Sequence, residues 1–119
     1  MKILTPGHLY ELENFEKPED PGLLLQFIEK VNYGEAYKLG HARPLAEGED
    51  AKTVLITVNN GTTNEEVLKV LIDRLKFLSA KFPCRETAIV ITKLEESLMW
   101  LEKRTADRKA RSVEGKHLA

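Results

Sequence analysis

The chain has 119 residues and a formal net charge of −1, with 42% hydrophobic and 31% charged side chains. That length suits one domain with its own core. The near-neutral charge disfavours a long nucleic acid as the partner, because proteins that bind one are usually strongly basic. A single cysteine excludes an internal disulfide and suits a reducing cytosol. No signal peptide opens the chain and no apolar run approaches a membrane span, so we expect a cytoplasmic protein.

Charge is distributed unevenly along the chain. Residues 1–50 hold five Lys/Arg against ten Asp/Glu, whereas residues 51–119 hold thirteen against nine. From Lys103 onward, six basic side chains stand against two acidic ones. An acidic first half and a basic end indicate a local anionic partner rather than DNA.

Residues 1–61 carry most of the turn signals and are predicted to form a small antiparallel β-sheet. Pro-Gly pairs punctuate two candidate strands, residues 8–16 and 23–31, although the second also fits a helix. Residues 34–52 are polar and are predicted as a loop. The clearest strand is KTVLITV, residues 52–58, which is short, apolar and β-branched and precedes an Asn-Asn-Gly turn.

Two helices are predicted in the rest of the chain. Thr63 and Glu66 form a capping box, so the first helix begins near Asn64, and Pro83 ends it. Because the connection at Pro83 is short, the next helix should return antiparallel to the first. The expected apolar face of the first helix is Leu68, Leu71, Ile72, Leu75 and Leu78, and a separate flank holds Val67, Val70, Arg74 and Phe77.

The second helix is predicted to be long and amphipathic, from Cys84 to about Gly115. Its apolar stripe recurs at steps of three and four, at Ile91, Leu94, Leu98 and Leu101. Arg104, Arg108 and Arg111 then follow at steps of four and three, so that one face carries three guanidinium groups. Such a face suits phosphate. Alternatively, it faces solvent and stabilises the helix end.

The predicted fold is therefore α+β, with a small N-terminal antiparallel β-sheet (residues 1–61) followed by a C-terminal antiparallel helical hairpin (62–115) and a short tail (116–119). These parts are expected to form a single domain, residues 1–119. Two helices and a few strands leave apolar surface uncovered, including that of Trp100, so we expect the hairpin to mediate oligomerisation through its long helix.

Neither a catalytic constellation nor a metal site is predicted. His8, His41 and His117 are scattered, with no cysteine or carboxylate at ligand spacing. No histidine stands in a recognisable relation to Cys84 that would make it a nucleophile. We therefore expect neither a cofactor nor a metal.

Two segments make a specific combination: GTTNEEVLKVLIDRL and PCRETAIVITKLEESLMWLEKRTADRKARSVEG. Through them, residues 61–115 resemble the phage Thoeris anti-defence proteins of the first type, whose helical hairpin is shared with a phage anti-CBASS sponge family. The segments YELENF and LLLQFIEK resemble this family less closely.

The resemblance implies a binding protein and not an enzyme. Members of the family bind cyclic ADP-ribose isomers made by host TIR-domain proteins, such as glycocyclic ADP-ribose, and hold them without cleavage. This starves the Thoeris effector of its signal in the cytoplasm of the infected bacterium. The resemblance also implies pockets at a homodimer interface, assembly of some members into hexamers, and binding of cyclic di- or trinucleotides by some members.

The resemblance further implies the site residues. Phe77 would be the aromatic side chain beside the adenine, and Arg104 and Arg108 would bind the phosphates. Thr87 occupies a pocket position that is often Asn in relatives. Without the resemblance, Phe77 would be interpreted as a core residue.

Three other functions remain open. The chain could capture the cyclic di- or trinucleotides of CBASS immunity instead. An enzyme that degrades the signal would need a general base, and the neighbouring carboxylates Asp107 and Glu114 form no convincing pair. A plain dimerisation or DNA-binding module would bind DNA in a salt-dependent way, which the acidic first half disfavours.

Overall fold

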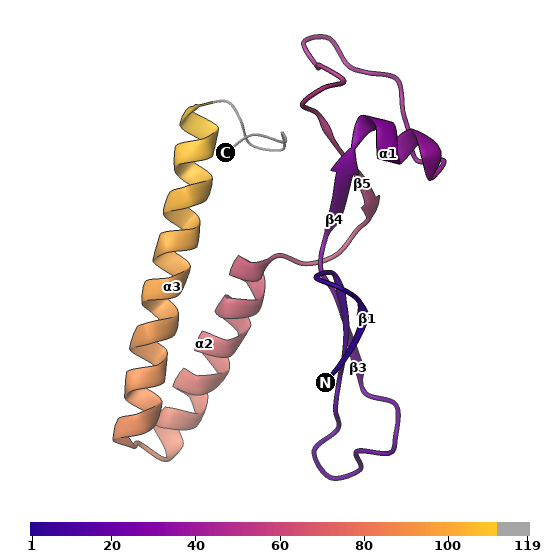
Figure 1. Cartoon of the computed structure of the whole chain (residues 1–119). Helices are drawn as coiled ribbons and strands as arrows, with labels where there is room; N and C mark the ends of the chain where they lie inside the picture. Colours follow the sequence, from indigo (N-terminus) through magenta and orange to yellow (C-terminus); the bar gives the residue numbers. More distant parts are fainter. Residues whose placement is uncertain (112–119) are drawn as a thin grey trace. The chain divides into compact units, whose positions relative to one another are not determined.

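The computed structural model describes residues 1–111, which fall into two compact units, Met1–Thr62 and a second unit that begins at Thr63 (Figure 1). The first unit holds the strands and one short helix, and the second is a helical hairpin. The α+β prediction, with strands first and a hairpin after them, is thus confirmed. The single domain of residues 1–119 stays a prediction. Within the described range, no helix is long and apolar enough to cross a membrane.

The first unit contains two small antiparallel sheets rather than one. The strands β1 (Lys2–Thr5), β2 (Leu9–Leu12) and β3 (Leu23–Gln26) form a three-stranded sheet in that order. The strands β4 (Glu29–Asn32) and β5 (Leu55–Asn59) form the second sheet. Of these five strands, β1 lies outside every predicted strand.

The prediction of one strand over residues 23–31 is wrong, because the segment is divided between the two sheets. At the division the backbone changes partners. The Phe27 N–H donates to the His8 carbonyl at 2.7 Å, and the Ile28 N–H donates to the Thr62 carbonyl at 2.9 Å. Gly61 permits this close approach, since a side chain there would collide with the backbone of Gln26.

The prediction of a loop over residues 34–52 is wrong at its start, where Tyr33–Lys38 forms the helix α1. The Asn32 side chain caps this helix by accepting a hydrogen bond from the Glu35 N–H at 2.8 Å. Ala36 in α1 is fully buried and packs with two residues near and in β5, Val54 and Ile56, to form the core of this unit.

Within the loop that follows α1, Arg43 and Glu49 form an ion pair. The two guanidinium nitrogens of Arg43 donate to the two carboxylate oxygens of Glu49 at 2.6 and 2.8 Å. The Ala46 N–H donates to the same carboxylate at 2.6 Å. The Arg43 hydrogen bonds, followed by that from Ala46, lower the pKa of Glu49 to about 2.

The second unit consists of α2 (Asn64–Lys81) and α3 (Arg85–Ala110), joined by a three-residue connection. The Thr63 side chain accepts from the Glu66 N–H at 3.2 Å, as the predicted N-cap requires. Within the described residues α3 ends at Ala110; its predicted end near residue 115, and the tail after it, lie outside them.

The two helices pack through a narrow seam. Among the described residues of the hairpin, one apolar side chain is buried: Ile72 of α2, which is 7% exposed. No described side chain of α3 is buried to this extent. Leu71 was wrongly assigned to the apolar face and is 42% exposed, because one helical step turns it away from Ile72. An exposed ion pair, Lys76–Glu95 at 3.0 Å, links the helices beside the seam. The half-buried positions of α3 are Thr87, Ile91, Leu94, Leu98, Leu101, Thr105 and Arg108.

We predict that Ile72→Ala lowers the free energy of unfolding of the hairpin by about 2–5 kcal/mol, because it leaves a cavity in the seam. Lys69→Ala, on the exposed side of the same helix, should change it by less than about 0.5 kcal/mol. Chemical denaturation followed by circular dichroism measures both. An Ile72→Ala variant as stable as the wild type would show that packing of Ile72 between α2 and α3 does not stabilise the hairpin.

We also predict that Glu49 titrates near pH 2 in the folded protein, and that Arg43→Gln returns its pKa toward the ordinary value of about 4.3. Because the folded-state pKa is depressed, the ion pair stabilises the loop fully above about pH 4.3 and stops doing so as the pH falls through about 2. Carboxyl chemical shifts recorded against pH test this. The same midpoint in both proteins would count against the ion pair.

Candidate ligand-binding site on the hairpin

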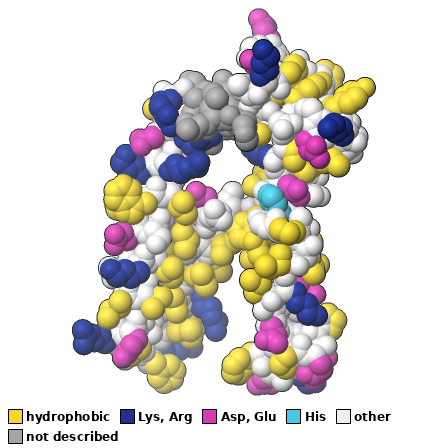
Figure 2. All heavy atoms as spheres, viewed as in Figure 1, with side chains coloured by type: hydrophobic (Ala, Val, Ile, Leu, Met, Phe, Trp, Pro, Cys, Tyr) yellow, Lys and Arg dark blue, Asp and Glu magenta, His cyan; other side chains and the backbone are white. Residues whose placement is uncertain are grey.

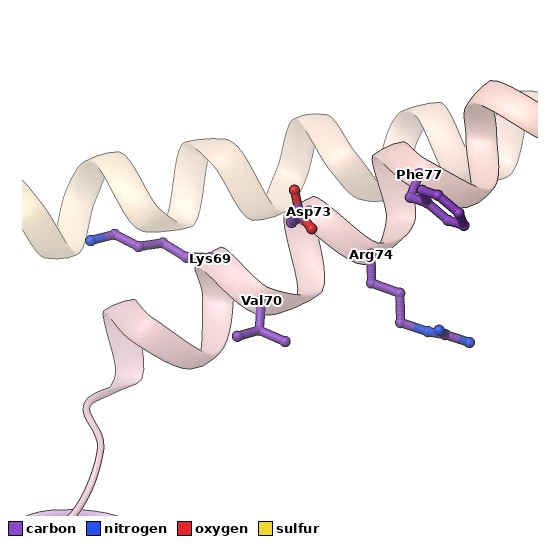
Figure 3. Close-up of a pocket in the computed structure, with 5 residues that line it drawn as sticks. All are labelled: Lys69, Val70, Asp73, Arg74 and Phe77. Carbon is purple, nitrogen blue, oxygen red and sulfur yellow. The ribbon is translucent and has the colours of Figure 1, made fainter.

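The outer side of α2 carries a stripe of four side chains at steps of four, three and four: Val70, Arg74, Phe77 and Lys81. A hollow of about 450 Å³ lies along it, and its lining residues are Lys69, Val70, Asp73, Arg74 and Phe77 (Figure 3). Phe77 is 59% exposed and Val70 is 62% exposed. The interpretation of Phe77 as a core residue is therefore wrong, and its ring is accessible to a ligand.

Charged groups flank the Phe77 ring. The Lys81 ammonium lies 4.5 Å from the ring centroid, a cation–π contact. Arg74 extends to the same side of the helix as Val70, whereas Asp73 extends to another side (Figure 3). The lining of the hollow thus combines an aromatic ring with two cations, Lys69 and Arg74, and one carboxylate, Asp73, so positive charge predominates, which suits a flat anionic ligand.

The two predicted phosphate-binding arginines both lie on α3, one turn apart, but in different surroundings. Arg104 is exposed, whereas Arg108 is half-buried. A hollow of about 240 Å³ groups Arg104 with Trp100 and Arg111, together with Lys103 and Asp107, which pair with each other at 2.8 Å. Arg108 does not line this hollow.

Sequence reasoning missed the relation between Trp100 and Arg104. It interpreted Trp100 as apolar surface awaiting a partner, yet the indole is 58% exposed and shares its hollow with charged side chains. The signal was present in the spacing, because Trp100, Arg104 and Arg111 stand at steps of four and seven and so face one side of a helix.

Thr87 lies in the first turn of α3 and is half-buried. Its backbone N–H donates to the Cys84 sulfur at 3.4 Å, and its hydroxyl oxygen lies 3.0 Å from the same sulfur. The Thr87 side chain thus participates in the cap of α3. Its contact with a ligand stays a prediction.

Phe77 and the arginines are far apart within one hairpin. Phe77 is one turn before the end of α2, and the neighbouring Lys76 pairs with Glu95 of α3. From Glu95, Arg104 is nine residues further along α3 and Arg108 thirteen, which corresponds to about 14 Å and about 20 Å along the axis. The structure therefore does not bring the predicted aromatic and arginine residues into one pocket within a single chain.

Residues 43–106 match the sequence model of a family described as Acb2/Tad1, hairpin domain. That match covers more than half of the chain, including all of α2 and most of α3. The chain belongs to the Acb2/Tad1 hairpin domain family.

The chain is similar to Thoeris anti-defense 1 of Bacillus phage SBSphiJ7, with 56% identity over 59 residues. This stretch is 49% of the present chain and 42% of the relative, so the match spans less than half of that relative's length. The resemblance found in the sequence is confirmed. No solved structure matches the chain. Among residues 1–111, no group of three or more His, Cys, Asp and Glu side chains is placed to hold a metal ion.

Proposed function

We propose that the protein is a phage anti-defence sponge, which binds a cyclic ADP-ribose isomer made by host TIR proteins and holds it without cleavage. Sequestration of the signal in the cytoplasm of the infected bacterium would block Thoeris immunity. The observation that carries this proposal is the 56% identity to Thoeris anti-defense 1. The exposed side chains of Phe77 and Arg104 also support it, because an aromatic ring and a guanidinium group suit the base and the phosphates of such a ligand.

Glycocyclic ADP-ribose, the isomer that we favour, presents a flat adenine and two phosphates. Adenine would stack on the exposed ring of Phe77, an interaction of about 1–3 kcal/mol per base. Arg104 and Arg108 would bind the phosphates through charge-assisted hydrogen bonds. Thr87 would contribute less than an Asn at this position, because its hydroxyl already lies 3.0 Å from the Cys84 sulfur.

We infer that the complete site is composite, formed by the hairpins of two chains in a homodimer, which can assemble further into hexamers. The separation of Phe77 from the arginines along the hairpin supports this, because an antiparallel partner would bring one chain's aromatic to the other chain's arginines. Figure 2 shows hydrophobic side chains open to solvent on the hairpin. The exposed large apolar residues of the hairpin are Val70, Leu71, Phe77, Phe82, Ile89, Val90, Met99 and Trp100.

Binding without cleavage is also supported by the surroundings of Arg104. Asp107, the carboxylate in its hollow, is paired with Lys103 at 2.8 Å. Among the described residues that line this hollow, Asp107 is the one carboxylate, so they provide no pair of carboxyl groups for general acid–base catalysis.

We predict that the protein binds glycocyclic ADP-ribose tightly and releases it unchanged on heat denaturation. Mass spectrometry of the supernatant, after excess ligand has been removed before heating, measures what is released. Recovery of intact ligand in proportion to the protein is expected. ADP-ribose or another cleaved product in excess over the protein would instead indicate an enzyme that degrades the signal. Capture of cyclic di- or trinucleotides alone would indicate a sponge for the signals of CBASS immunity.

We predict that Arg104→Ala with Arg108→Ala weakens binding of this ligand by at least one to two orders of magnitude, because each lost charge-assisted contact costs about 1.5–3 kcal/mol. Phe77→Ala should also weaken it, by roughly tenfold. Lys93→Ala removes a positive charge from α3 away from the arginines and serves as the matched control. Calorimetry measures affinity and sedimentation checks assembly. Wild-type affinity in the double arginine variant would exclude the site.

Mixing the double arginine variant with Phe77→Ala tests the composite pocket. Neither variant has an intact site alone, but a mixed dimer should regain one, in which the aromatic and the arginines come from different chains. Calorimetry after denaturation and refolding of the mixture measures the regained sites. Absence of regained binding, with mixed dimers present, would show that one chain supplies both groups.

A further inference from the structure

The outer stripe of α2 holds more binding chemistry than the proposed function uses. Of its four members, the proposal assigns only Phe77. At about 100° per residue, Val70, Arg74, Phe77 and Lys81 lie within about 60° of one another. Ile72, on the seam, lies on the opposite side of the helix. The stripe therefore faces away from the seam, and it presents an apolar residue and an aromatic ring with one cation on each side of the ring.

Arg74 has no carboxylate partner within the described part of the chain. The acidic residue that precedes it, Asp73, extends to another side of α2 (Figure 3). Glu66, two turns earlier, has its carboxylate 4.0 Å from the Lys69 ammonium. The Arg74 guanidinium therefore keeps all its donors available to an anion, and no ion pair has to be broken before it binds one.

The geometry beside Phe77 suits a base linked to an anionic group. Side chains three residues apart on a helix have Cβ atoms about 5–6 Å apart, so the Arg74 fork reaches a ligand stacked on Phe77. Lys81 occupies one face of the ring at 4.5 Å, which leaves the other face for the base. The hollow of about 450 Å³ is open to solvent along α2, and Val70 adds an apolar contact to it.

We propose that Arg74 is a further ligand-binding residue, which donates hydrogen bonds to an anionic group of the ligand whose base stacks on Phe77. This inference rests on the proposed function. In this arrangement α2 provides two contacts, Phe77 to the base and Arg74 to the anionic group. The phosphates are then bound from both helices of the composite site rather than by the arginines of α3 alone.

The experiment measures binding of glycocyclic ADP-ribose by calorimetry at low and high salt for the wild type, Arg74→Gln, Arg74→Lys and Lys69→Gln. Arg74→Gln should weaken binding roughly tenfold or more at low salt, and its affinity should depend less on salt than that of the wild type. Arg74→Lys should restore part of the loss, because it keeps the charge without the bidentate fork. Lys69→Gln, which removes the other cation of the same hollow, is the matched control. Sedimentation and circular dichroism verify that each variant assembles and folds as the wild type does.

The possible failures are distinguishable. If Arg74→Gln binds as tightly as the wild type while the double arginine variant does not bind, the role of Arg74 is overturned and the proposed function stands. An equal loss in Arg74→Gln and Lys69→Gln would indicate general attraction by positive charge and would also overturn a specific contact. If the folded wild type does not bind the probe at all, the proposed function fails and this inference fails with it.

Discussion

The hairpin depends on one narrow contact, the seam between α2 and α3. Ile72 is its buried apolar side chain in the described range, and every position of α3 keeps some exposure. Few apolar side chains are therefore buried between the two helices. In consequence, large apolar and aromatic groups remain on the outer sides of both helices, where Phe77 and Trp100 are each more than half exposed. The same packing that holds the hairpin together thus leaves these groups accessible on its surface.

Charge on these outer surfaces is arranged to leave selected cations available. Exposed ion pairs contribute little to stability, and pairs between described residues of the hairpin include Lys69, Lys76 and Lys103. Arg74 and Arg104 are left beside aromatic rings instead. Arginine matches phosphate better than lysine does, because its planar fork can donate two parallel hydrogen bonds. Arg74 and Arg104, each beside an aromatic ring, therefore have the arrangement that the proposed nucleotide ligand would require.

The hairpin could be predicted from sequence because its signals are local. Thr63 supplies the first cap, and the 3.6-residue period locates the seam. The strands of the first unit could be predicted in part, but not all their boundaries, because these depend on distant partners. The break within residues 23–31 is set by hydrogen bonds to His8 and Thr62. Local signals also compete, as at Asn32, which suits a turn but caps α1. Within the candidate site, the sequence indicated which residues share a helix face but not which hollows they line.

In the proposed composite site, ligand binding and assembly cannot be independent. The ligand would contact both chains at once, so it binds the dimer more tightly than the separate hairpins and stabilises the dimer by mass action. The coupling is reciprocal, because whatever favours association also raises the apparent affinity for the ligand. A hairpin in which Ile72, at 7% exposed, is the most buried side chain among the described residues gains more from such contacts than one with a large core. Capture of the signal would therefore also consolidate the protein that captures it, which suits a sponge that must retain its ligand rather than release it.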